Sequence, residues 1–287
     1  PRPPSTAHTC TLSNEHESPA MSLSPATPAI AARAQALFDA HRDGRPFAPF
    51  TGAQALGSLG EAYRVQRAYV ELTVAARRTA IAGYKIGLTS PRMQAMCGID
   101  SPIAGAVLGD RLHGDGVTLR RADYGRLGIE FEIAVRMARD LPASAAPFDF
   151  DTVAAAVGAV APAVEVVDDR AAVYQGLDMA TLVADNAWNA GVVLGTWHER
   201  WGDLAAAEAV VECDGTEIDR GYGREVLGHP FHSLTWLANH LAQGGDGLRA
   251  GHVIATGSIV TTRFPAGPER YRYRVAGLGD VSFSVTA

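Results

Sequence analysis

Lysine is almost missing from this chain of 287 residues, which carries 24 Arg and a single Lys, Lys85. A codon bias toward arginine accounts for this count as well as chemistry does. The chemical interpretation is that arginine serves wherever a surface cation is needed. Arginine keeps its proton near neutral pH, whereas a buried lysine can release one. Lys85 is therefore a candidate for a task that needs a titratable amine.

Cysteine is scarce as well, and the three present are Cys10, Cys97 and Cys213. They are odd in number, far apart and form no C-x-x-C pair, which argues against a disulfide framework and against a zinc knuckle. We expect a cytoplasmic location on this basis.

Long apolar runs and basic clusters are also lacking. No run approaches the ~18 apolar residues that a membrane helix needs. The formal net charge is −6, with no stretch of consecutive Lys or Arg. We therefore expect neither a membrane nor a nucleic acid as a partner.

What is present predicts an α+β fold that is mainly β. Residues 1–21 are polar and rich in Pro, Ser and Thr, so we expect a disordered extension. Residues 22–80 form a helical N-terminal region, with a helix over 28–42 and a second one opened by the capping-box spacing of Ser58 and Glu61. Residues 81–287 contain short runs separated by glycines, which favour a curved β-roll or barrel, with a short helix over 151–163 and a hairpin turning at Asp214–Gly215.

Two carboxylates share one face of a predicted strand. In GIEFEIAVRM, Glu130 and Glu132 are two residues apart, so both side chains point the same way, while Ile129 and Phe131 face the core. An isolated E-x-E is usually a solvated face or is paired with arginines. Glu165 adds a third carboxylate on a second apolar run, flanked by Val164 and Val166. A buried carboxylate needs a partner, and three oxygen ligands suit a hard cation, Mg²⁺ or Mn²⁺.

The ordered set of motifs resembles the 2-keto-4-pentenoate hydratase group of the fumarylacetoacetate hydrolase-like superfamily, which includes 4-oxalocrotonate decarboxylases. The motifs run from about residue 30 to the C-terminus. They are GYKIGLTS at 83–90, IEFEIAV, AVEVVDDR at 163–170, VADNA at 183–187, LGHP at 227–230 and ATGS at 255–258.

The resemblance implies a β-roll with a helical N-terminal region, assembled as a homo-oligomer, a dimer or higher. It implies a divalent ion, Mg²⁺ or Mn²⁺, held by Glu130, Glu132 and Glu165, with the family's lysine at Lys85 and its acidic residue at Asp110. The ion would chelate the carboxylate and oxo oxygens of a small 2-oxo acid and stabilise an enolate. Lys85 would move protons or hold the enolate, and needs a lowered pKa to act as a base.

Further residues are weighed on local pattern. Thr256 and Ser258 end a strand, where they either contact a substrate carboxylate or form a plain turn. Asn186 is expected to support the site. Asp168 either supports the site or is a polar strand end paired with Arg170.

Several departures from the family pattern concern the substrate. Trp188 and Asn189 follow VADNA where small residues are usual, and the segment after Ser258 lacks the usual Gly/Pro-rich loop. The leading interpretation is a hydratase, a hydro-lyase that gives a 4-hydroxy-2-oxo acid in aromatic-compound degradation. The alternatives are a 4-oxalocrotonate-type decarboxylase, a C–C bond hydrolase and a non-catalytic homologue.

Overall fold

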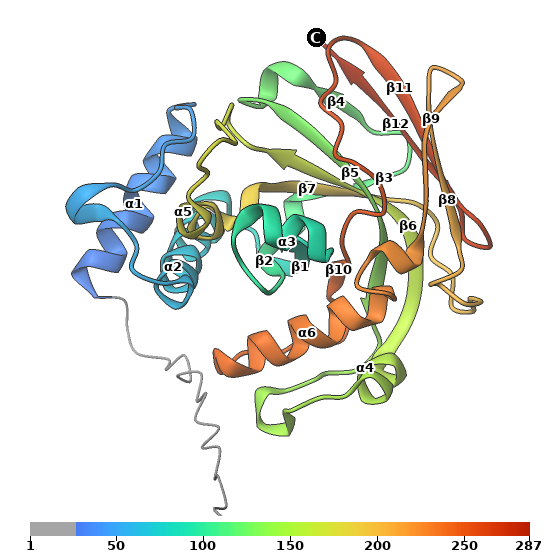
Figure 1. The fold of residues 1–287 in the computed structure, drawn as a ribbon, viewed down its shortest axis with the longest axis horizontal. Helices are drawn as coiled ribbons and strands as arrows, with labels where there is room; N and C mark the ends of the chain where they lie inside the picture. Colours follow the sequence, from blue (N-terminus) through green and yellow to red (C-terminus); the bar gives the residue numbers. More distant parts are fainter. Residues whose placement is uncertain (1–26) are drawn as a thin grey trace, which may run out of the picture.

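The computed structural model describes residues 27–287, in which helices at the left and at the bottom of the picture border two β-sheets (Figure 1). The predicted extension over residues 1–21 lies outside the described residues. The α-helices are α1 (Pro28–Arg42), α2 (Leu59–Arg77), α3 (Pro91–Cys97), α4 (Phe150–Ala156), α5 (Met179–Ala184) and α6 (Pro230–Gln243). Short 3₁₀ turns lie at η1 (Gly52–Gln54), η2 (Gly109–Arg111), η3 (Arg121–Asp123), η4 (Ala143–Ala145), η5 (Asn186–Trp188) and η6 (Gly223–Glu225).

Twelve strands of the described chain form two sheets, in which antiparallel pairs predominate. The seven-stranded sheet has the order β2-β1-β10-β5-β6-β7-β3, and the five-stranded sheet has the order β4-β12-β11-β8-β9. The strands are β1 (Ile81–Gly87), β2 (Ile103–Leu108), β3 (Leu112–Gly114), β4 (Thr118–Arg120), β5 (Leu127–Met137), β6 (Val157–Asp168), β7 (Asn189–Leu194), β8 (Glu208–Cys213), β9 (Thr216–Tyr222), β10 (Val253–Ala255), β11 (Glu269–Val275) and β12 (Gly279–Thr286). The predicted α+β class, mainly β, is confirmed.

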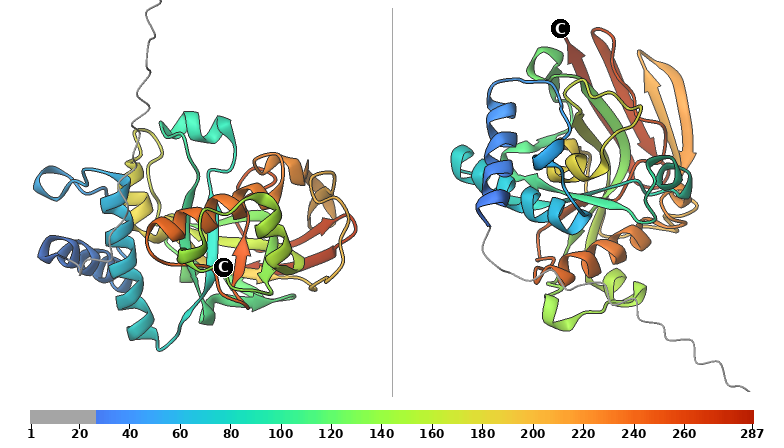
Figure 2. Two further views of the ribbon diagram at one scale, coloured as in Figure 1. Left: turned by 90° about the horizontal axis from the view of Figure 1, so that it is seen from below. Right: turned by 60° about the vertical axis from the view of Figure 1, so that its left-hand side comes forward.

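Local sequence signals place the N-terminal helices. α1 spans the predicted range 28–42. At the start of α2, the hydroxyl of Ser58 accepts a hydrogen bond from the backbone N–H of Glu61 at 3.1 Å, as a capping box requires. The helix ends where Arg78 adopts a left-handed φ of 53°. Both helices lie beside the sheets in every view of the ribbon (Figure 2).

The predicted helix over 151–163 is only half right. α4 ends at Ala156, and β6 begins at Val157. The following residues pair with β5 along almost its whole length, from Met137 opposite Val157 to Leu127 opposite Asp168. Strand pairing therefore overrides the local helical pattern. The hairpin predicted at Asp214–Gly215 is confirmed, because β8 and β9 pair on either side of that turn.

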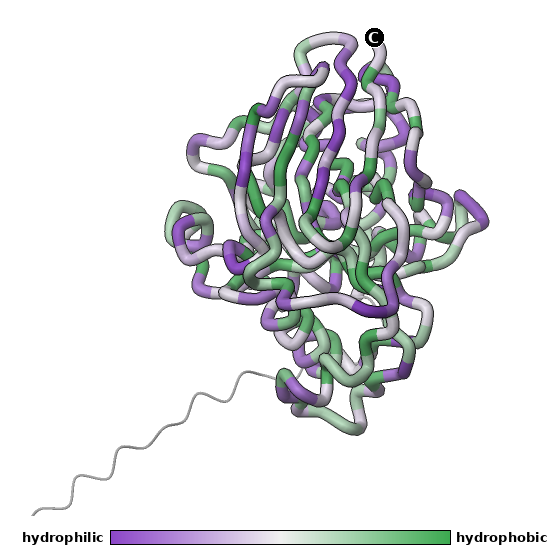
Figure 3. The backbone as a smooth tube through the Cα atoms, turned by 90° about the vertical axis from the view of Figure 1, so that its right-hand side faces the viewer, coloured by the Kyte–Doolittle hydropathy of each residue, from purple (hydrophilic) through white to green (hydrophobic). Residues whose placement is uncertain are grey.

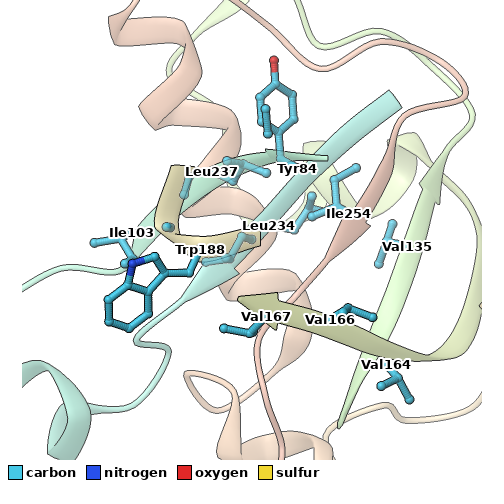
Figure 4. Close-up of a cluster of buried hydrophobic side chains, with 14 of the residues drawn as sticks. Tyr84, Ile103, Val135, Val164, Val166, Val167, Trp188, Leu234, Leu237 and Ile254 are labelled. Atoms are coloured by element: carbon cyan, nitrogen blue, oxygen red, sulfur yellow. The ribbon is translucent and has the colours of Figure 1, made fainter. Parts of the chain in front are cut away.

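The two faces of β5 have different surroundings. Phe131 faces the five-stranded sheet, with its ring centroid 5.3 Å from that of Tyr273. Along the outer strands hydrophilic and hydrophobic residues alternate, as one buried face demands (Figure 3). Leu234 and Leu237 of α6 belong to the same buried cluster as Tyr84 (Figure 4). Glu130 and Glu132 lie on the other face of β5. No helix within residues 27–287 combines the length and apolar character needed to cross a membrane.

Candidate metal centre

Four neighbouring strands bring Lys85 and the three glutamates together. The order β1-β10-β5-β6 places Lys85 beside Ala255, Ala255 beside Ala134, and Glu130 directly opposite Glu165. Glu132 stands two residues from Ala134 and so faces the same side of the sheet. One carboxylate oxygen from each of the three glutamates lies within 4.8 Å of the other two. The structure thus brings together all three predicted metal ligands and the predicted lysine.

These carboxylates are strongly desolvated. Glu132 and Glu165 are fully buried, and Glu130 is half-buried. Burial raises the pKa of Glu132 well above its ordinary value, and the charges of Glu165 and Glu130 raise it further. Burial also raises the pKa of Glu165 to about 7, although Lys85 opposes that shift. Three clustered carboxylates cannot all ionise here unless positive charge joins them.

Two oxygen atoms in the cluster lack a partner within the described chain. Oε1 of Glu132 and Oε2 of Glu165 are buried and accept no hydrogen bond from residues 27–287. Native structures seldom leave buried carboxylate oxygens without a ligand. An all-oxygen set with unsatisfied buried atoms fits a hard divalent cation such as Mg²⁺ or Mn²⁺. Glu130, Glu132 and Glu165 are thus a group that could hold such an ion.

Lys85 lies inside this cluster. Its side chain is buried, and Nζ is 3.2 Å from Oε1 of Glu165. Burial alone would lower the pKa of Lys85, but the charges of Glu165, Glu130 and Glu132 outweigh it, so the pKa is raised. The lowered pKa that Lys85 would need to act as a base is thus not found among these side chains alone. Lys85 is a charged donor here rather than a ready base.

Backbone and hydroxyl donors orient the glutamates. The backbone N–H of Gly257 donates to Oε2 of Glu132 at 2.7 Å, and Thr262 Oγ1 donates to Oε1 of Glu130 at 2.7 Å. Gly257 has a φ of 122°, and a Cβ there would lie 2.3 Å from Oγ1 of Thr89. Only glycine fits this conformation and this close approach. The GLTS and ATGS motifs therefore meet at Gly257, the residue that donates to Glu132.

A strained turn supplies the next donor. Asn186, Ala187 and Trp188 have φ values of 53°, 47° and 60°, each unfavourable by about 1 kcal/mol or more for a residue with a Cβ. The amide of Asn186 offsets this cost with two bonds to the backbone of Ala106, at 2.7 and 2.8 Å. Directly after the turn, Asn189 Nδ2 donates to Oε1 of Glu165 at 2.9 Å. Asn186 therefore supports the site by holding the turn.

The preceding residue of the VADNA motif also anchors this turn. Asp185 is buried, accepts from Arg170 at 2.5 Å and lies 2.6 Å from Nε2 of His41. Neither Asp185 nor Asn186 belongs to the glutamate cluster. Both residues of the motif instead hold the backbone of the turn in place. A cavity of about 330 Å³ borders this turn; its lining includes Trp188, Asn189, Tyr69 and Arg111.

Asp110 is not brought into the cluster. Gly105 stands opposite Lys85, Leu108 stands opposite Ile81, and Asp110 follows in η2, beyond the end of β2. Its carboxylate pairs with Arg77 at 2.5 Å and is about one-third exposed. The side-chain contacts of Arg77 lower the pKa of Asp110, although burial opposes them. A catalytic role for Asp110 finds no support in this placement.

The other predicted contacts have structural partners. Thr256 Oγ1 donates to the carbonyl of Ile133 at 2.8 Å, and Ser258 Oγ donates to that of Val260 at 2.8 Å. The hydroxyls are thus committed to the backbone, and Gly257 between them contacts the glutamate cluster. Asp168 accepts backbone N–H groups, including that of Arg126 at 3.1 Å, and is a loop anchor. The supporting contacts of Gly257, Thr262 and Asn189 were not predicted.

Comparison with known proteins places this geometry in a family. The family described as fumarylacetoacetate (FAA) hydrolase C-terminal matches residues 101–286. A 2-keto-4-pentenoate hydratase of Burkholderia vietnamiensis (strain G4 / LMG 22486) is 35% identical over 262 residues, which cover 90% of this chain and 97% of that protein. A 2-hydroxyhexa-2,4-dienoate hydratase of Comamonas testosteroni is 32% identical over 261 residues, covering 90% and 97%.

A solved structure agrees with the fold. The 4-oxalocrotonate decarboxylase from Pseudomonas putida G7, complexed with magnesium and adipate, superimposes with a TM-score of 0.84 at 30% identity, covering 91% of this chain and 99% of that one. The sequence relatives and this structure extend over nearly the whole chain. The chain therefore belongs to the fumarylacetoacetate hydrolase family, in the group of its 2-keto-4-pentenoate hydratase and 4-oxalocrotonate decarboxylase relatives.

Proposed function

We propose that this protein is a divalent-metal-dependent hydratase, a hydro-lyase. It adds water to a 2-hydroxy-2,4-dienoate, or its 2-oxo-4-enoate form, and yields a 4-hydroxy-2-oxo acid in the degradation of aromatic compounds. The observation that carries the proposal is the buried cluster of Glu130, Glu132 and Glu165 with Lys85 at its edge. The hydratase names of relatives that span the chain support the same reaction.

The chain's own residues supply binding and proton control. Glu130, Glu132 and Glu165 would hold Mg²⁺ or Mn²⁺, which would supply Lewis acidity for a 2-oxo acid. Glu165 holds the ammonium of Lys85, which is placed to donate a proton or to hold the negative oxygen of an enolate. Gly257 and Thr262 fix the orientation of Glu132 and Glu130. Burial of the cluster keeps bulk water away from these charges.

A decarboxylase of the 4-oxalocrotonate type is the second candidate, because the neighbour with a TM-score of 0.84 has that name. It would use the same enolate-stabilising groups to release CO₂. A C–C hydrolase and a non-catalytic homologue are further alternatives. A homo-oligomer, dimer or higher, and a cytoplasmic location remain predictions.

Product analysis tests the proposal. Purified protein is incubated with 2-hydroxypenta-2,4-dienoate and Mg²⁺ or Mn²⁺, and the loss of dienol absorbance is followed with identification of the product. Formation of 4-hydroxy-2-oxopentanoate, dependent on metal, supports the hydratase. CO₂ release from 2-oxohex-3-enedioate without hydration of the dienoate would make the protein a decarboxylase instead. Two carbon fragments would indicate a hydrolase.

A further inference from the structure

An aromatic rim lies just outside the glutamate cluster, on the same face of the sheet. It consists of Phe47, Tyr174, Trp188 and Phe264. Their rings form a continuous row in which each neighbouring pair packs edge to face. The centroid distances are 5.2 Å from Phe47 to Trp188, 5.8 Å from Trp188 to Tyr174, and 6.4 Å from Tyr174 to Phe264. Such geometry is favourable for aromatic pairs.

The rim is tied to the cluster at two points. Phe264 follows two residues after Thr262, the hydroxyl that binds Glu130. Trp188 immediately precedes Asn189, the amide that binds Glu165. Gly128, two residues before Glu130 and about 7 Å along the strand, leaves room for the Phe264 ring, because a Cβ there would lie 3.1 Å from it. These links place Phe264 and Trp188 next to the residues that orient Glu130 and Glu165.

The rim is partly open to solvent. Tyr174 is 50% exposed and Phe264 is 41% exposed, although both are large apolar rings. Trp188 is buried, and its indole Nε1 makes no hydrogen bond to residues 27–287. Exposed aromatic side chains next to a buried polar cluster are typical of a ligand site rather than of a plain surface.

The charges around the rim are already matched. Arg126 lies on this face with its guanidinium 5.5 Å from the Tyr174 ring centroid and 5.1 Å from that of Phe264. It is held by the buried carboxylate of Asp169, which also accepts from the Tyr174 hydroxyl at 2.9 Å. Arg263, between Thr262 and Phe264, pairs with Asp219 at 2.7 Å. Each of these two arginines is therefore already paired with one carboxylate of the described chain.

Formal charge at the cluster leads to the same conclusion. Three ionised glutamates are balanced by Lys85 and a divalent cation together, so a substrate with one carboxylate leaves the site with one net negative charge. A second carboxylate on the substrate would add a second negative charge, beside an Arg126 that is already paired with Asp169. Uncharged groups gain free energy by leaving water for apolar surroundings, whereas an unpaired carboxylate loses it.

We propose that the rim of Phe47, Tyr174, Trp188 and Phe264 is the binding subsite for the distal end of the substrate, and that it selects 2-oxo acids with an uncharged alkyl or aryl tail over dicarboxylates. This inference rests on the proposed function, because it assumes that a 2-oxo acid is held at the glutamates. The 330 Å³ cavity is the less suitable place for the tail, since its lining includes neither Lys85 nor any of the three glutamates.

Binding of unreactive, saturated ligands tests the subsite without turnover. The dissociation constants of 2-oxopentanoate, 2-oxo-6-phenylhexanoate and 2-oxoadipate are measured by calorimetry on the Mg²⁺-loaded full chain. We expect the phenyl ligand to bind about tenfold or more tightly than 2-oxopentanoate, and 2-oxoadipate to bind more weakly. In Phe264→Ala and Tyr174→Ala the advantage of the phenyl ligand should fall to about twofold. Met96→Ala, at a residue 67% exposed and outside the rim, should keep it.

The proposal is overturned by tightest binding of 2-oxoadipate, and equally by an advantage of the phenyl ligand that survives in both rim variants. The first would mean that a cation recognises the tail, and the second that the tail lies elsewhere. If 2-oxopentanoate binds but the phenyl ligand gains nothing, the subsite alone is wrong. If none of the three ligands binds, the proposed function fails together with the subsite.

Discussion

Nζ of Lys85 lies 3.2 Å from Oε1 of Glu165, and both side chains are almost completely buried. An ion pair at this depth stabilises a fold only when its remaining atoms are satisfied as well. Here Oε2 of Glu165 has no partner among residues 27–287. The pair therefore makes better sense as part of a binding site than as a structural contact.

Replacing the lysine tests its part in proton transfer. We expect Lys85→Met to lower kcat by about a hundredfold or more, because the ammonium beside Glu165 is lost. Lys85→Arg should not restore activity, since a planar guanidinium is larger than the ammonium and does not fit the same buried place beside Glu165. Steady-state rates with the dienoate substrate measure this, with circular dichroism as a check on folding. Wild-type rates in Lys85→Met would remove Lys85 from the mechanism.

Asp110 allows a comparison with Lys85. The structure pairs Asp110 with Arg77 beyond the end of β2. We therefore expect Asp110→Asn to lower kcat far less than Lys85→Met does, and to cost at most about 1 kcal/mol of stability, as expected for a partly exposed ion pair. Equal loss of kcat in both variants would show that Asp110 reaches the reacting atoms, as the family resemblance implied.

The contact between Gly257 and Thr89 predicts a large effect of a single methyl group. Gly257→Ala places a Cβ 2.3 Å from Oγ1 of Thr89 at a φ of 122°. We expect the free energy of unfolding to fall by about 2 kcal/mol or more. Urea denaturation measures this, and Gly202→Ala is the matched control because nothing lies within 4 Å of that position. Similar stability in both variants would mean that the GLTS and ATGS segments do not meet as described.

His240 predicts a dependence of stability on pH. The ring lies 4.3 Å from that of Tyr63 and 4.9 Å from that of Trp236, and burial lowers the pKa of His240 from 6.5 to about 4. Between pH 6.5 and about 4, the His240 side chain is protonated in the unfolded chain but neutral in the folded protein. Stability is therefore complete above pH 6.5 and declines as the pH falls toward 4, by at most about 3 kcal/mol.

Unfolding free energies at pH 7 and pH 4.5 measure this contribution. His240→Phe keeps a ring in the stack but cannot titrate, so the acid-induced loss should be smaller in this variant than in the wild type. His232→Phe, at an exposed position of the same helix, is the control. An unchanged loss in His240→Phe would show that His240 is not held neutral.

The sequence predicted the centre of the site better than its surroundings. The alternation around Glu130 and Glu132 gave their shared face, the flanking valines indicated the burial of Glu165, and the lysine count singled out Lys85. These are local signals. The pairing of β5 with β6, which sets Glu130 opposite Glu165, is a long-range contact. No local sequence pattern predicts it, and only the resemblance to the family implied that these glutamates act together.

The errors and omissions have physical causes too. The helix pattern over 151–163 was interrupted because residues from Val157 onward gain a partner strand. Thr262 could not be foreseen, because its contact with Glu130 joins a loop to a strand 132 residues away. For Thr256 and Ser258 the sequence left substrate contact and a plain turn open, because a hydroxyl in sequence gives no sign that a backbone carbonyl accepts from it.

The central claim is that Glu130, Glu132 and Glu165 hold one divalent cation, and titration of Mn²⁺ into the metal-free protein tests it most directly. Calorimetry or paramagnetic resonance would follow binding to the wild type, to Glu132→Gln, and to Glu217→Gln as an exposed control. We predict one bound ion per chain in the wild type and the control, and an affinity at least about tenfold lower in Glu132→Gln. Equal affinity in all three proteins would contradict the assignment of the site.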